Sequence, residues 1–115
     1  MWYKYKKATY LVSTCLELLM FQKEHITAFA LAARYGLKRT VHAGFLGPAD
    51  MVMKALQLFK ANRIGHGYRI LEDEKLYKQV IEMGIHFEGS PITANLMATG
   101  NKNPVVRYAL DGASF

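Results

Sequence analysis

TVHAGF at residues 40–45 and RIGHGY at residues 63–68 are two short runs in which strand-forming residues lead to a histidine. A helix-length amphipathic segment separates them, so each run has the position of a strand in a strand–helix–strand unit. Strands joined by such a crossover are parallel, and side chains at their carboxyl ends project into the crevice where α/β proteins bind ligands. The sequence therefore predicts that His42 and His66 lean toward one pocket, with neighbouring glycines leaving room for a ligand or a metal ion.

The rest of the chain continues this alternation of helices and strands. Apolar residues repeat at helical spacing after Glu24, after Pro48 and after Asp73, and a short strand-like run follows each of these segments. This order predicts an α/β fold with a parallel sheet of about three to four strands and flanking helices. Two segments, residues 10–20 and residues 105–110, stay undecided between helix and strand. The expected strands cover residues 37–43, 64–66 and 85–88.

The composition is that of one globular domain. The chain has 115 residues, is 51% hydrophobic and carries a net charge of +6, which is mild for a nucleic-acid-binding protein because the cations form no basic stripe. The single cysteine, Cys15, excludes an internal disulfide and indicates a reducing compartment, so we expect a cytoplasmic protein. Glu17 interrupts the apolar run within residues 4–21, so we favour a core-facing or frayed helix there over a secretory signal. We expect neither a membrane nor a nucleic acid as a partner.

The residue types alone leave two interpretations of the histidines open. A neutral imidazole is the commonest ligand for transition metals, and with an ordinary pKa near 6.5 it can also accept a proton from water at neutral pH. A lone histidine at a strand end is more often a hydrogen-bonded packing residue. His25 and His86 are expected to be structural, and Glu88 is expected to face the pocket, solvent or an arginine partner.

The two histidine motifs resemble those of the adenosine deaminase family, within the zinc-dependent amidohydrolase superfamily. The similarity continues through Leu71-Glu72-Asp73 and His86-Phe87-Glu88 to Pro91. It covers residues 21–115, which we treat as one adenosine deaminase-like partial barrel, and it leaves residues 1–20 as an unmatched N-terminal segment.

The resemblance implies a partial (β/α)8 barrel whose active site lies at the carboxyl ends of the strands. It implies that His42 takes the place of a zinc ligand, and that His66 takes the place of the general base that orients and deprotonates the zinc-bound water. The expected reaction is hydrolytic deamination of adenosine, or of a related 6-aminopurine nucleoside, to inosine and ammonia. The implied cofactor is zinc, and the implied partner is a purine nucleoside substrate.

The family pattern is incomplete in this chain. Phe45 stands at the position of the family's proton-donating glutamate, and the family's His-x-His pair and paired aspartates are absent from the sequence. A catalytic zinc needs about three protein ligands, so we expect an inactive or incomplete fragment. The alternative, from another class, is a non-catalytic interaction module that pairs its open sheet edges with a second copy or with another chain. An unrelated doubly wound small-molecule binder fits less well, because no glycine-rich phosphate motif follows the first strand.

Overall fold

Helices and strands follow one another along the chain in the predicted alternation. The computed structural model describes residues 10–13, 22–97 and 102–115. Within these ranges no helix has both the length and the apolar character needed to cross a bilayer. In chain order the elements are β1 (Tyr10–Ser13), α1 (Lys23–Arg34), β2 (Lys38–Ala43), α2 (Asp50–Leu58), β3 (Arg63–His66), the 3₁₀ helix η3 (Tyr68–Glu72), α3 (Glu74–Glu82), β4 (His86–Glu88), α4 (Pro91–Leu96) and α5 (Pro104–Leu110).

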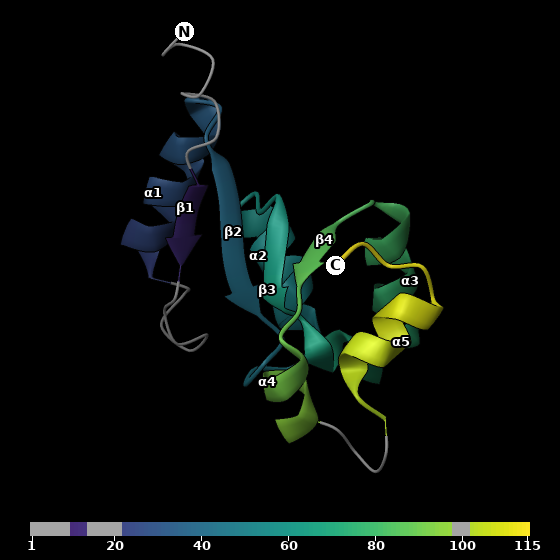
Figure 1. Ribbon diagram of the computed structural model, residues 1–115. Coiled ribbons are helices and arrows are strands. Elements are labelled where there is room, and N and C mark those ends of the chain that lie inside the picture. The colour runs from purple at the N-terminus through teal and green to yellow at the C-terminus, as the bar shows by residue number, and fades with distance from the viewer. Residues whose placement is uncertain (1–9, 14–21, 98–101) are drawn as a thin grey trace, which may run out of the picture.

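The strands form one parallel four-stranded sheet in the order β1-β2-β3-β4 (Figure 1). In this register His42 of β2 lies opposite Gly65 of β3, and Gly65 lies opposite Glu88 of β4. These three residues therefore form one row across the sheet. The parallel α/β arrangement that the sequence predicted is confirmed.

Both undecided segments are settled where the structure describes them. Residues 10–13 are extended and pair with β2, so this part of the first undecided segment is a strand, and the core-facing or frayed helix favoured over a secretory signal is wrong here. Strand-forming residues occupy these positions, and a partner strand is available to them. The rest of residues 1–20, including Cys15, lies outside the described residues. At the other end α5 is a helix, because Pro104 suits a first helical turn and the Asn103 side chain accepts a hydrogen bond from the Val105 amide.

The sheet has one face covered by helices and one face that carries the polar side chains. Val41, Ile64 and Phe87 are fully buried in the core, and α2 lies behind β2 and β3 in Figure 1. Successive side chains of a strand point to opposite faces, so His42 and Glu88 lie on the other face. In a closed barrel this second face is the interior, at whose carboxyl end active sites are built.

Candidate functional site

The structure brings the two predicted histidines into contact at the carboxyl ends of neighbouring strands. The imidazole rings of His42 and His66 have centroids 4.9 Å apart and planes at 84°, so the edge of one ring meets the face of the other. His42 lies one position before the end of β2, and His66 is the last residue of β3. Both rings are partly exposed, as a site open to a ligand requires.

The backbone at His66 is in a conformation that side-chain-bearing residues rarely adopt. His66 has φ +66° and the next residue, Gly67, has φ +74°. Two successive left-handed residues turn the chain sharply out of β3, and the Gly67 amide donates a 3.0 Å hydrogen bond to the carbonyl of Ala43. A Cβ on Gly67 would lie 2.6 Å from the Phe87 ring, so this turn also needs glycine for space. Such strain persists where the surrounding structure enforces it, and it clusters at functional sites.

Phe45 lies on the His66 imidazole, in the position where the resemblance implies an acid. The two ring centroids are 4.8 Å apart with planes at 33°, and the Tyr68 ring is 6.3 Å from Phe45. A phenyl ring has no exchangeable proton. Position 45 therefore contributes aromatic packing to the site and no acidic proton.

Tyr68 is a site residue to which the sequence assigned no role. Its hydroxyl donates a 3.1 Å hydrogen bond to the Ser90 carbonyl and accepts one of 2.8 Å from the Ser90 amide. The same oxygen lies 3.5 Å from Nδ1 of His66. Tyr68 thus connects the imidazole to the turn that follows β4. Its place two residues after His66 was the available signal, but nothing in a single sequence marks Ser90 as its partner.

An ionic network lies on the same face of the sheet as His42. Arg63 Nε is 2.8 Å from Glu88 Oε1, and the Thr40 hydroxyl donates a 3.2 Å hydrogen bond to the same oxygen. Of the environments left open for Glu88, the arginine partner is therefore the observed one. His86 contacts Ser114 instead, with Nδ1 2.8 Å from the hydroxyl oxygen, which agrees with the structural role expected for it.

The described residues do not fit a complete zinc site. Zinc in a catalytic site takes about three protein ligands, usually imidazole nitrogens and carboxylate oxygens. Among the described residues no three His, Cys, Asp or Glu side chains come together in a way that could hold a metal ion. The neighbours of the His42–His66 pair include the ring of Phe45, which cannot coordinate a metal.

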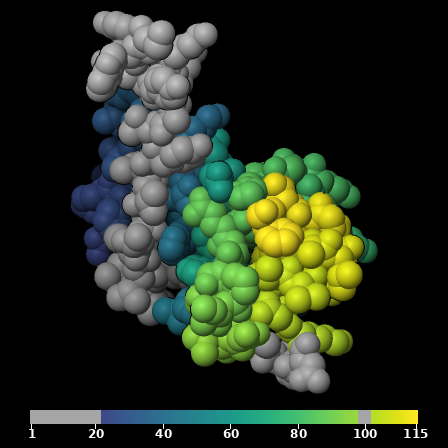
Figure 2. Space-filling model, in the orientation of Figure 1, coloured from purple at the N-terminus to yellow at the C-terminus, as the bar shows by residue number. Residues whose placement is uncertain are grey.

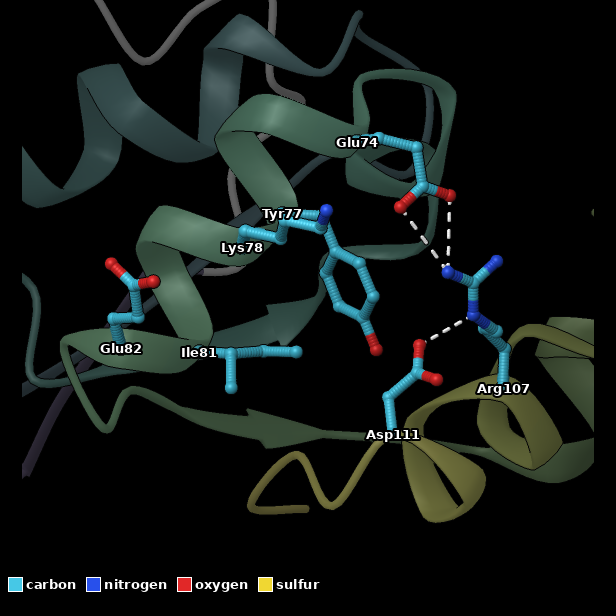
Figure 3. A pocket seen from close by; sticks show the side chains of 7 residues that line it. All are labelled: Glu74, Tyr77, Lys78, Ile81, Glu82, Arg107 and Asp111. Carbon is cyan, nitrogen blue, oxygen red and sulfur yellow. Dashed lines mark hydrogen bonds and ion pairs between the residues drawn. The ribbon is translucent and has the colours of Figure 1, made fainter.

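A separate pocket of about 290 Å³ lies between α3 and α5 (Figure 3). Arg107 is ion-paired there with both Glu74 and Asp111, and its guanidinium carbon is 5.6 Å from the centre of the Tyr77 ring. Burial, followed by the Asp111 carboxylate, raises the pKa of the Tyr77 hydroxyl. These contacts join two helices, so we assign the pocket a packing role.

Two solved structures define the class of protein to which this fold and site belong. An amidohydrolase from Burkholderia ambifaria with bound Zn matches with a TM-score of 0.74 and 25% identity, over 89% of this chain and 30% of that one. The adenine deaminase of Arthrobacter aurescens matches with a TM-score of 0.68 and 27% identity, over 76% of this chain and 28% of that one. The chain is thus a partial (β/α)8 barrel of the amidohydrolase class, as predicted.

Sequence comparison narrows this class to one family. The family model for adenosine deaminase matches residues 17–112. The adenosine deaminase of Gallus gallus is 44% identical over 103 residues, which is 86% of this chain and 29% of that protein. The adenosine deaminase of Danio rerio is 42% identical over 95 residues, 79% of this chain and 26% of that protein. The chain belongs to the adenosine deaminase family, and it spans less than a third of the length of these relatives.

Proposed function

We propose that this chain forms the His42–His66 side of an adenosine deaminase active site, and that the 115-residue polypeptide alone does not deaminate adenosine. The observation that carries the proposal is the edge-to-face contact of the two imidazoles, 4.9 Å apart at the carboxyl ends of β2 and β3. The whole site would hydrolyse adenosine, or a related 6-aminopurine nucleoside, to inosine and ammonia. A cytoplasmic location stays the expectation from the lone Cys15.

The proposed roles of individual residues rest on the resemblance of the two histidine motifs to those of the adenosine deaminase family. His42 is the candidate metal ligand, and His66 is the candidate general base that orients water. The metal would be zinc, but its ligand set needs side chains other than those described here. Phe45 supplies no proton where the family has a glutamate, and losing a general acid costs about 10²–10⁴-fold in rate.

The inactivity of the isolated chain is tested directly on the purified polypeptide. Circular dichroism establishes that it is folded, chromatography follows conversion of adenosine to inosine, and calorimetric titration measures zinc binding. We expect no turnover above the buffer rate and no micromolar affinity for zinc. Turnover and micromolar zinc binding that are both lost in His42→Ala, but kept in His25→Ala, would refute this part of the proposal.

The deaminase assignment is tested in a complete barrel. The host is the Gallus gallus adenosine deaminase, with its matching segment replaced by this chain. We expect the chimera to be at least about 10²-fold slower than the host, and Phe45→Glu to recover most of that loss because it returns a general acid. Adding His66→Ala should remove the recovered activity and leave the zinc content largely intact. A folded, zinc-loaded chimera that stays inactive with Phe45→Glu would contradict the assignment.

A second candidate function is a non-catalytic interaction module that pairs its open sheet edges with another chain, and exposed apolar side chains on α4 and α5 would add to such an interface. Ile92 and Leu96 are 82% and 79% exposed, and Leu110 is 79% exposed. In Figure 2, α4 and α5 form adjoining parts of one face. Size-exclusion chromatography with light scattering tests the case in which the partner is a second copy. That case requires a dimer or a larger assembly, which Leu96→Lys and Leu110→Lys should weaken. A monomer at all concentrations tested would exclude self-association.

A further inference from the structure

We propose that Gly65 is a positioning residue for His42. Because Gly65 has no side chain, the His42 imidazole can occupy the space where a Cβ of residue 65 would lie. The two residues are direct partners in the β2–β3 register and lie on the same face of the sheet. That this placement matters for catalysis rests on the proposed function. The contact between Gly65 and the His42 ring does not depend on it. Gly65 acts only through His42 and is assigned no contact with substrate.

The distances show how completely the ring fills this space. A Cβ built on Gly65 would lie 2.3 Å from Cδ2, 2.8 Å from Nε2 and 2.9 Å from Cγ of His42. Apart from its own residue and its chain neighbours, a Cβ in a protein essentially never comes within 3.0 Å of another heavy atom, so one of the two groups has to shift. All three atoms belong to one rigid ring. The conflict therefore can be relieved only by moving the whole imidazole or the strand beneath it.

The backbone gives no separate reason for a glycine at this position. Gly67 has a positive φ, a conformation that favours glycine, but Gly65 is not among the residues with positive φ. Inside a strand glycine is less favourable than alanine by about 0.5–1 kcal/mol. The ring of His42 is therefore the feature that accounts for the glycine.

Any side chain at position 65 would change how the two histidines meet. To avoid a Cβ, the His42 ring has to swing away from β3, and β3 is the strand that ends in His66. The 4.9 Å contact at 84° between the rings would then be lost. Gly65 thus fixes the direction of the candidate metal ligand relative to the candidate base.

A double-mutant cycle measures this contact by urea unfolding. We expect Gly65→Ala to lower the urea midpoint and to raise the equilibrium constant for unfolding by about tenfold or more, since overpacking is destabilising. In a His42→Ala background the ring is gone, so the same substitution should cost nothing or should stabilise slightly. Gly89→Ala is the matched control, because its Cβ would meet Val105 and no histidine, and its effect should be equal in both backgrounds.

A spectroscopic readout separates positioning from a general loss of stability. Isotope-edited NMR should show a cross-peak between the ring protons of His42 and His66 in the wild-type chain and in Gly89→Ala. The cross-peak should be absent in folded Gly65→Ala. A Gly65→Ala protein with the wild-type midpoint and the cross-peak retained would overturn the proposal.

The remaining outcomes are also decisive. An equal penalty for Gly65→Ala with and without the His42 ring would overturn the proposal, because the added Cβ would then conflict with another group. If Gly65→Ala alone does not fold, the doubly substituted chain decides: folding as stable as that of His42→Ala supports the proposal, and failure to fold refutes it. None of these measurements uses a nucleoside or a metal, so they succeed or fail independently of the deaminase assignment.

Discussion

His66 has a left-handed backbone conformation. Its energetic cost can be measured from the free energy of unfolding, without an activity assay. A residue with a Cβ at φ +66° carries a cost of roughly 1–2 kcal/mol that glycine does not. We therefore expect His66→Gly to be more stable than His66→Ala by about 1 kcal/mol in urea unfolding, because both variants lose the same imidazole contacts.

The matched control is the same pair of substitutions at His42, which is not among the residues with positive φ. There His42→Ala should be the more stable variant, since glycine weakens a strand interior. Equal stabilities of His66→Gly and His66→Ala would show that the left-handed turn does not persist in solution.

His86 makes stability depend on pH just below its ordinary pKa. Burial, followed by the nearby Arg63 cation, lowers the pKa of His86 below 6.5, and the Glu88 carboxylate opposes this shift. In the unfolded chain His86 then takes up a proton at a higher pH than in the folded chain, so its contribution to stability is lost as the pH falls from 6.5 toward the lowered folded pKa.

The measurement is urea unfolding of the wild type and of His86→Gln at pH 7.5 and at pH 5.5. The wild type should lose more stability between these two values than His86→Gln does. An identical loss in both proteins would mean that His86 has the same pKa folded and unfolded.

The meeting of the two histidines at the strand ends was predictable from the sequence. The side-chain pairs formed across strands were not. His42 and His66 meet because parallel strands end at one edge of a sheet, which the sequence indicates. The Arg63–Glu88 pair depends on the register of β3 and β4, and the contact of Tyr68 with Ser90 depends on how a turn folds back. A single sequence shows neither the register nor the fold of that turn.

At the scale of elements, Arg107 fastens α5 to α3. It forms an ion pair with Glu74 of α3 and with Asp111, which follows α5 (Figure 3). We expect Arg107→Ala to speed hydrogen exchange of the α5 amides, because local opening follows the loss of contacts that hold a helix in place.

Lys54→Ala is the control for this prediction. The Lys54–Asp50 ion pair lies within one helix, so removing it should leave the exchange of α5 unchanged. Equal exchange of α5 in wild type and Arg107→Ala would show that other contacts hold this helix.

Elements with both a periodic apolar stripe and end signals were predictable. Residues 50–58 and 74–82 combine such a stripe with a first-turn acid, and both are helices. Residues 10–13 gave no such signal, because whether a short apolar run becomes a strand depends on a partner strand remote in sequence. Pairing with β2 therefore decided that residues 10–13 form a strand, which their local sequence preference had left open.

At the scale of the molecule, the described residues do not by themselves make a complete zinc site, so changing one residue should not make the isolated chain active. The curated relatives are more than three times as long as this chain, which covers 26–29% of them. We expect Phe45→Glu in the isolated 115-residue chain to restore no deaminase activity, because the ligand set stays incomplete. The measurement is inosine formation with added zinc, and turnover by this variant would reveal metal ligands outside the described residues.

The alternation of the sheet between a packed face and a polar face has a consequence for how such a chain tolerates change. Val41 and Ile64 are wholly enclosed, so in a saturation mutagenesis library their substitutions should deplete cellular abundance. Substitutions of Glu88, which is partly accessible and points the other way, should deplete abundance less, because they remove only its contacts with Arg63 and Thr40. Residues on the two faces of one sheet therefore differ in how much substitution they tolerate, and positions on the polar face can change while the fold is kept.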